Sequence, residues 1–195
     1  MDSFKDVVRL VQPQCFFMTI DFQDAYSSVY LRSEERVNIC PLIFAKLLKP
    51  VFCHLWSLRI MVICYIDDCI FFAASEELIS NVSYALYLFY SVGITIVKKS
   101  VLVPTQEVKF LGIILNSCLM TATLPLRKII KIQELGRLLL KDRVSLRDLA
   151  SIIGLTVAAE PAVDLAPIRY KYLEIIRIKE LDQHHGDYDT RVSLE

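Results

Sequence analysis

Three aspartates are the residues of this sequence best suited to do chemistry. Asp21 closes a short apolar run rich in strand formers, and Asp67 and Asp68 lie between two further apolar runs, 60–66 and 69–74. A two-residue connection between strand-like runs predicts a β-hairpin with Asp67-Asp68 at its tip. A sheet that places the Asp21 strand beside this hairpin would bring the three carboxylates to one edge.

Clustered carboxylates of this kind suit a divalent cation. They repel one another, and their pKa values rise unless a cation neutralises them. Oxygen-only ligands favour Mg²⁺ over a transition metal, and two such ions about 3.5–4 Å apart can activate a 3′-hydroxyl and stabilise a leaving pyrophosphate. The alternative is an aspartate pair that only solvates a turn. Position between two apolar strands argues for the metal, but the residues alone leave both interpretations open.

Helical periodicity surrounds these strands. Residues 42–58 carry apolar side chains at helical spacing, although Pro50 is expected to kink or end that helix. Residues 75–92 predict a second helix, with Ser75 as its N-cap and Gly93 in a left-handed cap at its end.

The second half of the chain changes from strands to helices. Residues 94–97 and 110–115 predict strands. From Pro125 onward the pattern is helical, with a capping box that begins at Ser145 and a last helix over residues 168–181.

The order of elements and the length predict one domain, or one domain with an appendage. The chain has 195 residues, of which 54% are hydrophobic and 23% charged, so it can bury a substantial core. We expect an α+β fold, with an antiparallel sheet and packed helices in residues 1–124 and a helical region in residues 125–195.

Charge balance gives little support for a nucleic-acid partner. Lys and Arg total 22, equal to Asp and Glu, whereas nucleic-acid proteins usually show a basic face. A local basic run does exist, but on charge alone an ordinary solvated helical face is the favoured interpretation. Its members are Arg127, Lys128, Lys131, Arg137, Lys141, Arg143 and Arg147.

No membrane segment or secretory signal is expected from the sequence. No stretch approaches about 18 uninterrupted apolar residues, and the first residues lack the pattern of a signal peptide. The six cysteines show no metal-ligand spacing and lie mostly in apolar runs, where a free Cys behaves as a small hydrophobe. They predict a reducing, intracellular compartment and no zinc site.

Several short motifs, in a fixed order, resemble the reverse transcriptases. Asp-Phe-Gln-Asp-Ala-Tyr at residues 21–26 resembles motif A, and Tyr-Ile-Asp-Asp at 65–68 resembles motif C. Gly93 followed by Lys99-Ser100 resembles motif D, and Phe110-Leu111-Gly112 resembles the primer grip.

The C-terminal part is similar to the connection region of DIRS-type (tyrosine-recombinase) retrotransposon polyproteins. Residues 145–154 and 160–163 carry this similarity. The resemblance covers nearly the whole chain and implies a polymerase palm followed by a thumb- or connection-like region.

The resemblance also implies a metal site. Asp21 and Asp67 would hold two Mg²⁺ ions, or Mn²⁺, supported by Asp68 and by the backbone carbonyl of Phe22. Lys99 would lie near the leaving pyrophosphate as an acid, or would be an ordinary surface lysine.

Further roles concern the substrates that the resemblance implies, a deoxynucleoside triphosphate and an RNA or DNA template with its primer. Asp24 and Ala25 would offer backbone N–H groups to the triphosphate. Tyr26 would block a ribose 2′-hydroxyl, or would be a core aromatic at a strand-to-helix junction. Phe110, Leu111 and Gly112 would position the primer end. The basic run would contact phosphates as a thumb does.

Two departures from the family pattern predict impaired activity. Only 14 residues precede the motif A strand, too few for the fingers region. The Leu-Pro-x-Gly-Leu turn of motif B is absent, since no glycine precedes Gly93. Because positioning supplies much of the rate in phosphoryl transfer, we expect little or no polymerase activity.

Two functions therefore stay open. The chain is either a reverse-transcriptase-like protein of retroelement origin with impaired RNA-directed DNA synthesis, or a non-catalytic remnant that binds nucleic acid or a partner. The sequence leaves the oligomeric state open.

Overall fold

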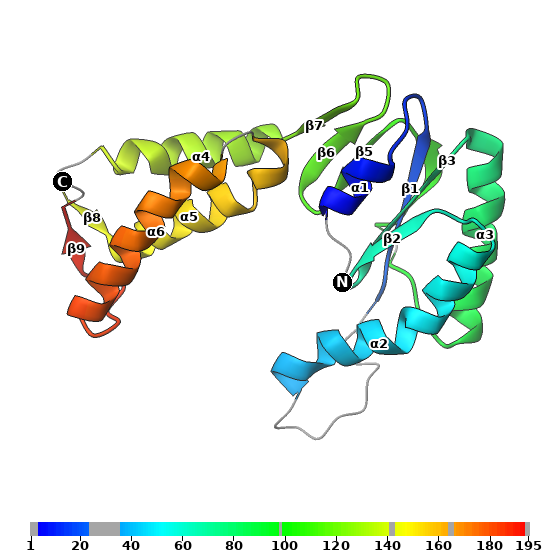
Figure 1. The fold of residues 1–195 in the computed structure, drawn as a ribbon, viewed down its shortest axis with the longest axis horizontal. Helices are drawn as coiled ribbons and strands as arrows, with labels where there is room; N and C mark the ends of the chain where they lie inside the picture. The colour runs from blue at the N-terminus through cyan, green and yellow to red at the C-terminus, as the bar shows by residue number, and fades with distance from the viewer. Residues whose placement is uncertain (1–3, 24–35, 98, 141–142, 164–165, 194–195) are drawn as a thin grey trace. The chain divides into compact units, whose positions relative to one another are not determined.

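The computed structural model describes residues 4–23, 36–97, 99–140, 143–163 and 166–193. The chain folds into two compact units (Figure 1). Unit 1 comprises Met1–Leu111 and Leu115–Thr121, and unit 2 comprises Gly112–Ile114 and Ala122–Glu195.

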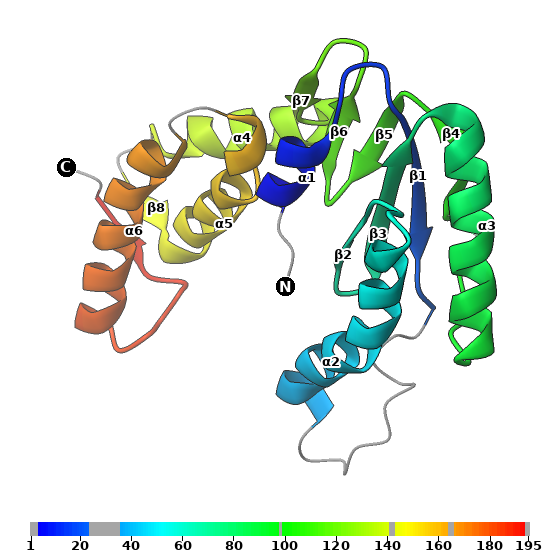
Figure 2. The ribbon, with the colours of Figure 1, turned by 45° about the vertical axis from the view of Figure 1, so that its right-hand side comes forward.

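A four-stranded antiparallel sheet forms the centre of unit 1 (Figure 2). Its strand order is β2-β3-β1-β4, so the two middle strands are the ones that end or begin at an aspartate. The strands are β1 (Phe16–Asp21), β2 (Val62–Tyr65), β3 (Asp68–Ala73) and β4 (Val101–Thr105). The predicted antiparallel sheet and α+β class are confirmed.

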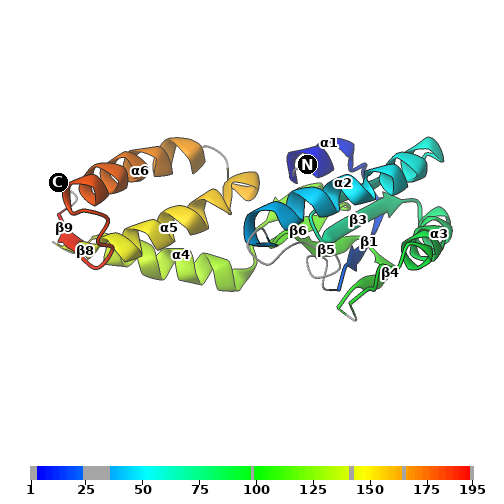
Figure 3. The same ribbon diagram turned by 90° about the horizontal axis from the view of Figure 1, so that it is seen from below.

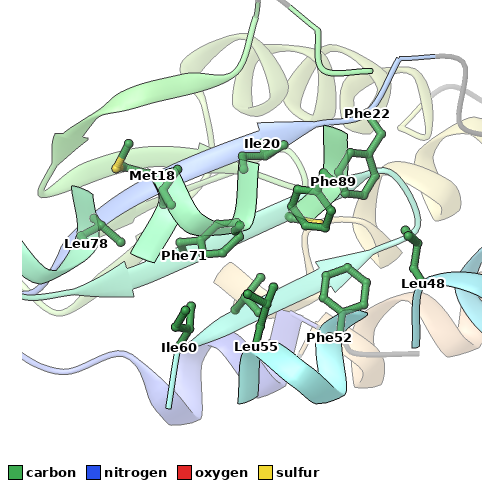
Figure 4. Packing of buried hydrophobic residues seen from close by; sticks show 14 of the residues in the cluster. Met18, Ile20, Phe22, Leu48, Phe52, Leu55, Ile60, Phe71, Leu78 and Phe89 are labelled. Atoms are coloured by element: carbon green, nitrogen blue, oxygen red, sulfur yellow. The ribbon is translucent and has the colours of Figure 1, made fainter. Parts of the chain in front are cut away.

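Two helices pack on one face of this sheet. Successive strand residues point to opposite faces, and Met18 and Ile20 of β1 lie in one buried cluster with Phe22, the residue after the strand (Figure 4). The same cluster contains apolar residues of α2 (Arg36–Ser57) and α3 (Ser75–Ser91). Asp21 therefore belongs to the opposite face, the one that α2 and α3 leave uncovered. A short helix, α1 (Phe4–Leu10), precedes the sheet.

Helix α2 does not end at Pro50, so that alternative of the prediction is wrong, and the predicted kink stays a prediction. The helix begins at Arg36 and continues through Pro50 to Ser57. An interior proline costs a helix about 3 kcal/mol. The buried residues Phe44, Leu48, Phe52 and Leu55 offset this cost, because each buried apolar side chain contributes about 1.5–3 kcal/mol.

Helix α3 confirms its predicted end but not its predicted start. Gly93 has φ +81° and its N–H donates to the carbonyl of Tyr90 at 3.0 Å, as a left-handed cap requires. The N-cap is Ala74, without a side-chain bond, so the prediction of Ser75 as the cap was wrong by one residue.

The strands after α3 also differ from the prediction. Residues 94–97 form only an isolated bridge, between Ile96 and Phe22. The predicted strand 110–115 is divided between two strands. The structure has β5 (Glu107–Phe110), β6 (Ile113–Asn116) and β7 (Thr121–Thr123), in the order β5-β6-β7.

Unit 2 is mainly helical (Figure 3). A buried cluster joins α5 to residues of α4, α6 and β9. The Ser145 half of the predicted capping box is present, since the Ser145 side chain accepts from the backbone N–H of Asp148 at 3.1 Å. The Asp148 carboxylate accepts from the Ser145 hydroxyl at 2.7 Å. The elements are α4 (Leu126–Leu138), β8 (Val144–Ser145), α5 (Leu146–Val157), the 3₁₀ helix η1 (Glu160–Ala162), α6 (Ala166–Gln183) and β9 (Arg191–Val192).

Cys64 and Cys69 form a disulfide between β2 and β3. The prediction that the cysteines are free is therefore wrong for this pair. Because disulfides persist mainly in oxidising surroundings, the cysteines no longer support a reducing compartment. The intracellular location stays a prediction.

Among the helices of the described residues, none is long and apolar enough to cross a membrane.

Candidate functional site

The sheet register brings Asp21 and Asp68 together. Asp21, the last residue of β1, pairs with Asp68, the first residue of β3. The backbone N–H of Phe22 donates to the carbonyl of Asp67 at 3.0 Å, and that of Val97 donates to the carbonyl of Asp21 at 2.8 Å. Three backbone segments thus meet at this end of the sheet.

The hairpin turn lies one residue earlier than predicted. Tyr65 pairs with Asp68, so the two connecting residues are Ile66 and Asp67, not Asp67 and Asp68. Ile66 has φ +61°, a conformation that a β-branched residue rarely adopts and that costs about 1–3 kcal/mol. Asp68 is consequently part of the ladder, where its pairing fixes it opposite Asp21.

Asp68 lies in an environment that disfavours its charge. Burial is the main cause, followed by a hydrogen bond and repulsion from Asp21 and by repulsion from Asp67; together they raise the pKa of Asp68 to about 6. Asp21 itself is buried, with 8% of its surface exposed. The carboxylates of both paired strands therefore act on one another, as the sequence predicted.

Lys99 supplies the positive charge at this site. Its Nζ lies 2.5 Å from Oδ2 of Asp21, and 68% of its side chain is exposed. The hydrogen bond and the charge of Asp21 raise the pKa of the Lys99 ammonium, with smaller contributions from Asp68 and Asp67. Lys99 therefore lies within the field of all three carboxylates.

Ser100, for which the sequence predicted no separate role, contacts the backbone of Asp21. Its hydroxyl oxygen accepts a hydrogen bond from the backbone N–H of Asp21 at 3.0 Å. Ser100 thus holds the backbone of Asp21, the residue whose carboxylate Lys99 contacts. The signal in the sequence that could have indicated this contact is that Ser100 belongs to the stretch that resembles motif D.

The donor set and the charge fit a divalent cation. The side chains are carboxylates, the ligands that Mg²⁺ prefers, and three carboxylates face one ammonium, which leaves negative charge in excess. Within the described residues, however, no group of three or more His, Cys, Asp or Glu side chains converges closely enough to hold a metal ion. Ligation by Asp21, Asp67, Asp68 and the Phe22 carbonyl stays a prediction.

Phe22 is anchored by its ring. The side chain is buried, and its ring meets that of Phe89 edge to face with centroids 4.9 Å apart. This packing fixes the backbone directly after Asp21. The residues predicted to bind the triphosphate, Asp24, Ala25 and Tyr26, lie outside the described residues.

The predicted primer grip is the tip of a second hairpin. Leu111 and Gly112 connect β5 to β6 with φ +48° and +75°, the pattern of a type I′ turn. Phe110 before them is buried. At Gly112 an added Cβ would meet only the flexible end of the Lys128 side chain, which can move aside, so it is the positive φ that favours glycine here. The role of this hairpin in binding a primer stays a prediction.

The basic run divides into exposed and paired members. Arg127, Lys131 and Arg137 of α4 are exposed, and none of the residues of α4 is buried. Arg147 of α5 instead forms an ion pair with Asp189 at 2.9 Å. Lys141 lies outside the described part of the chain. Among the described residues of the run, the exposed cations outside this ion pair are those of α4 and Arg143.

Solved structures similar to this chain are viral reverse transcriptases. A foamy viral protease–reverse transcriptase in complex with double-stranded DNA matches with a TM-score of 0.64 and 16% identity, over 100% of this chain and 39% of that one. Another, in complex with an RNA/DNA hybrid, matches with a TM-score of 0.57 and 19% identity, over 89% of this chain and 28% of that one. A third, in complex with double-stranded DNA, matches with a TM-score of 0.56 and 18% identity, over 94% of this chain and 45% of that one.

These matches establish the fold. The chain has a reverse-transcriptase-like fold, and it spans less than half the length of each of these three viral proteins. The sequence matches no family model and no curated protein. The narrower resemblance to DIRS-type elements stays a prediction.

Proposed function

We propose that this chain is a reverse-transcriptase-like protein of retroelement origin, related to DIRS-type elements, that acts inside the cell. Its site would bind divalent cations, Mg²⁺ or Mn²⁺, and the chain would bind a template–primer duplex. The observation that carries the proposal is the pairing of Asp21 with Asp68 beside the Ile66–Asp67 turn.

The three aspartates would hold the cations, and other residues would position them or bind the duplex. Asp21 and Asp67 would hold the cations and Asp68 would support them. Bound cations would supply charge stabilisation to an in-line phosphoryl transfer onto a primer 3′-hydroxyl. Ser100 and the backbone of Val97 hold Asp21 in place. The exposed cations of α4 would contact phosphates of the duplex.

The rate of DNA synthesis is proposed to be low. The motif B turn is missing from the sequence, so the chain lacks a part that positions the template and the nascent base pair in the family. Because positioning supplies much of the rate in phosphoryl transfer, cations and duplex would bind without efficient extension.

A non-catalytic nucleic-acid-binding function is the second candidate. One observation favours it: no three metal-ligand side chains converge within the described residues. The exposed basic surface of α4 would then act without the carboxylates. Such binding would depend on salt, because it releases counterions from the phosphates.

Cation binding and primer extension on the purified chain test the first candidate. We expect Mn²⁺ binding, measured by calorimetry, that is lost in Asp21→Asn and in Asp67→Asn. Extension of a DNA primer on an RNA template with Mg²⁺ or Mn²⁺ should be weak or absent. Strong extension that Asp67→Asn abolishes would contradict the proposed impairment, whereas absence of cation binding would contradict the site.

Binding to an RNA–DNA hybrid separates the two candidates. The chain with both Asp67→Asn and Asp68→Asn is compared with the unchanged chain across a salt series, with and without Mg²⁺. Equal, Mg²⁺-independent affinity in the two chains would favour the non-catalytic function.

A further inference from the structure

The ion pair between Lys99 and Asp21 suggests a role for Lys99 in the cation-free chain. The ammonium Nζ lies 2.5 Å from Oδ2 of Asp21, a distance within the range of a charge-assisted hydrogen bond. This oxygen belongs to the buried carboxylate of the three, since Asp67 and Asp68 are partly exposed. Lys99 therefore contacts a carboxylate that the proposed cation site requires.

The two partners differ in their freedom to move. Asp21 is fixed through its backbone by Ser100 and Val97, and only 11% of its side chain is exposed. Lys99 is 68% exposed on a long stem, so its head group can leave Asp21 for water. Displacement of Lys99 thus requires no rearrangement of the sheet.

A lysine ammonium and a divalent cation on the same carboxylate repel one another, because both are positively charged and only a few ångströms would separate them. We propose that Lys99 is an internal counter-ion, which neutralises Asp21 in the cation-free chain and is displaced when a divalent cation binds. The inference rests on the proposed cation site. Cation loading is then an exchange, in which a divalent ion replaces one lysine ammonium and releases it to solvent.

The exchange has two consequences for binding. Lys99 weakens the apparent cation affinity, because its contact with Asp21 must be broken. It also reduces repulsion among the carboxylates when no cation is present. A chain without this lysine charge should therefore bind cations more tightly.

The test is Mn²⁺ affinity of the full chain, measured by calorimetry and by the signal of free Mn²⁺ in electron paramagnetic resonance. We expect Lys99→Gln to tighten the dissociation constant about fivefold, the upper range for breaking an exposed ion pair. Lys99→Arg keeps the charge and should stay closer to the unchanged chain. Lys109→Gln, at an exposed lysine of β5, should leave the affinity unchanged.

A second readout follows Lys99 itself. The lysines are reductively methylated with ¹³C, which keeps their charge, and the Lys99 signal is assigned by its loss in Lys99→Arg. Titration with Mg²⁺ should shift the Lys99 signal and leave that of Lys109 in place. A static Lys99 signal with saturating Mg²⁺ would contradict displacement.

The outcomes separate this inference from the proposed function. If the unchanged chain binds Mn²⁺ but Lys99→Gln binds it equally or more weakly, the counter-ion role is wrong and the cation site stands. If neither chain binds Mn²⁺, both the inference and the proposed site are wrong.

Discussion

Asp68 shows how a residue can be placed where its own charge is unfavourable. Its side chain is partly buried and lies beside Asp21, with Asp67 next to it in the chain. Lys99 offsets part of this repulsion but contacts Asp21 rather than Asp68. The charged form of Asp68 therefore contributes unfavourably to folding of the cation-free chain.

The stability of the cation-free chain should depend on pH through Asp68. The pKa of Asp68 is raised from 3.8 to about 6 in the folded chain. A raised carboxyl pKa contributes stability below about pH 4, and this contribution is lost as the pH rises through about 6. We expect Asp68→Asn to raise the free energy of unfolding at pH 7.5 by about 1 kcal/mol, after allowance for partial exposure.

Urea unfolding in a chelator measures this effect. The advantage of Asp68→Asn should shrink between pH 7.5 and pH 4.5. A variant that is less stable than the unchanged chain throughout this range would show that the environment of Asp68 does not disfavour its charge.

At the scale of elements, two hairpins carry Asp67, Asp68 and the predicted primer grip, and each has an unusual turn. The β2–β3 turn contains Ile66 at positive φ, and the β5–β6 turn contains Leu111 and Gly112 at positive φ. Tertiary packing must hold such turns, because local preference opposes Ile and Leu in this conformation. The Cys64–Cys69 disulfide joins the residue pair next to Tyr65 and Asp68, the pair that closes the β2–β3 turn.

Substitution of Gly112 tests the second turn. Gly112→Ala should lower the free energy of unfolding by about 1–2 kcal/mol, because φ +75° is strained for alanine. The matched control is Gly154→Ala in the interior of α5, where a Cβ meets nothing within 4 Å. That change should stabilise the chain by about 0.5–1 kcal/mol. Chemical denaturation compares both variants; equal effects would contradict the requirement for glycine in the β5–β6 turn.

Removal of the disulfide tests the first hairpin. Cys64→Ser should lower the free energy of unfolding by about 2 kcal/mol, the loop-closure contribution of so short a loop. Its thermal midpoint should no longer respond to a reductant. Cys53→Ser, at an exposed free cysteine, should change neither quantity. A thiol count that finds Cys64 and Cys69 reduced in the purified chain would contradict the crosslink.

At the scale of the whole molecule, the chain combines a sheet unit with a helical unit. The sheet unit contains all three aspartates and Lys99, and the helical unit contains the exposed cations of α4. The boundary predicted at residues 124–125 and the contribution of each unit to binding stay predictions. The similar viral chains are each more than twice as long as this one.

The sequence by itself determined the class of fold and the end of the sheet that carries the carboxylates. Alternating apolar runs, the left-handed cap at Gly93 and the capping box at Ser145 are local signals, and each depends on a few neighbouring residues. The order of motifs predicted a reverse-transcriptase palm, and the similar solved structures bear out that fold.

Only the tertiary structure decided how these parts meet. The register places Asp68 rather than Asp67 opposite Asp21, and it depends on the pairing of strands far apart in the chain. Burial of one face carries α2 through Pro50 against its local preference. The contact of Lys99 with Asp21 and the bond from Asp21 to Ser100 likewise join distant residues. Such contacts leave no periodic signal in a sequence, since they arise from packing rather than from local preference.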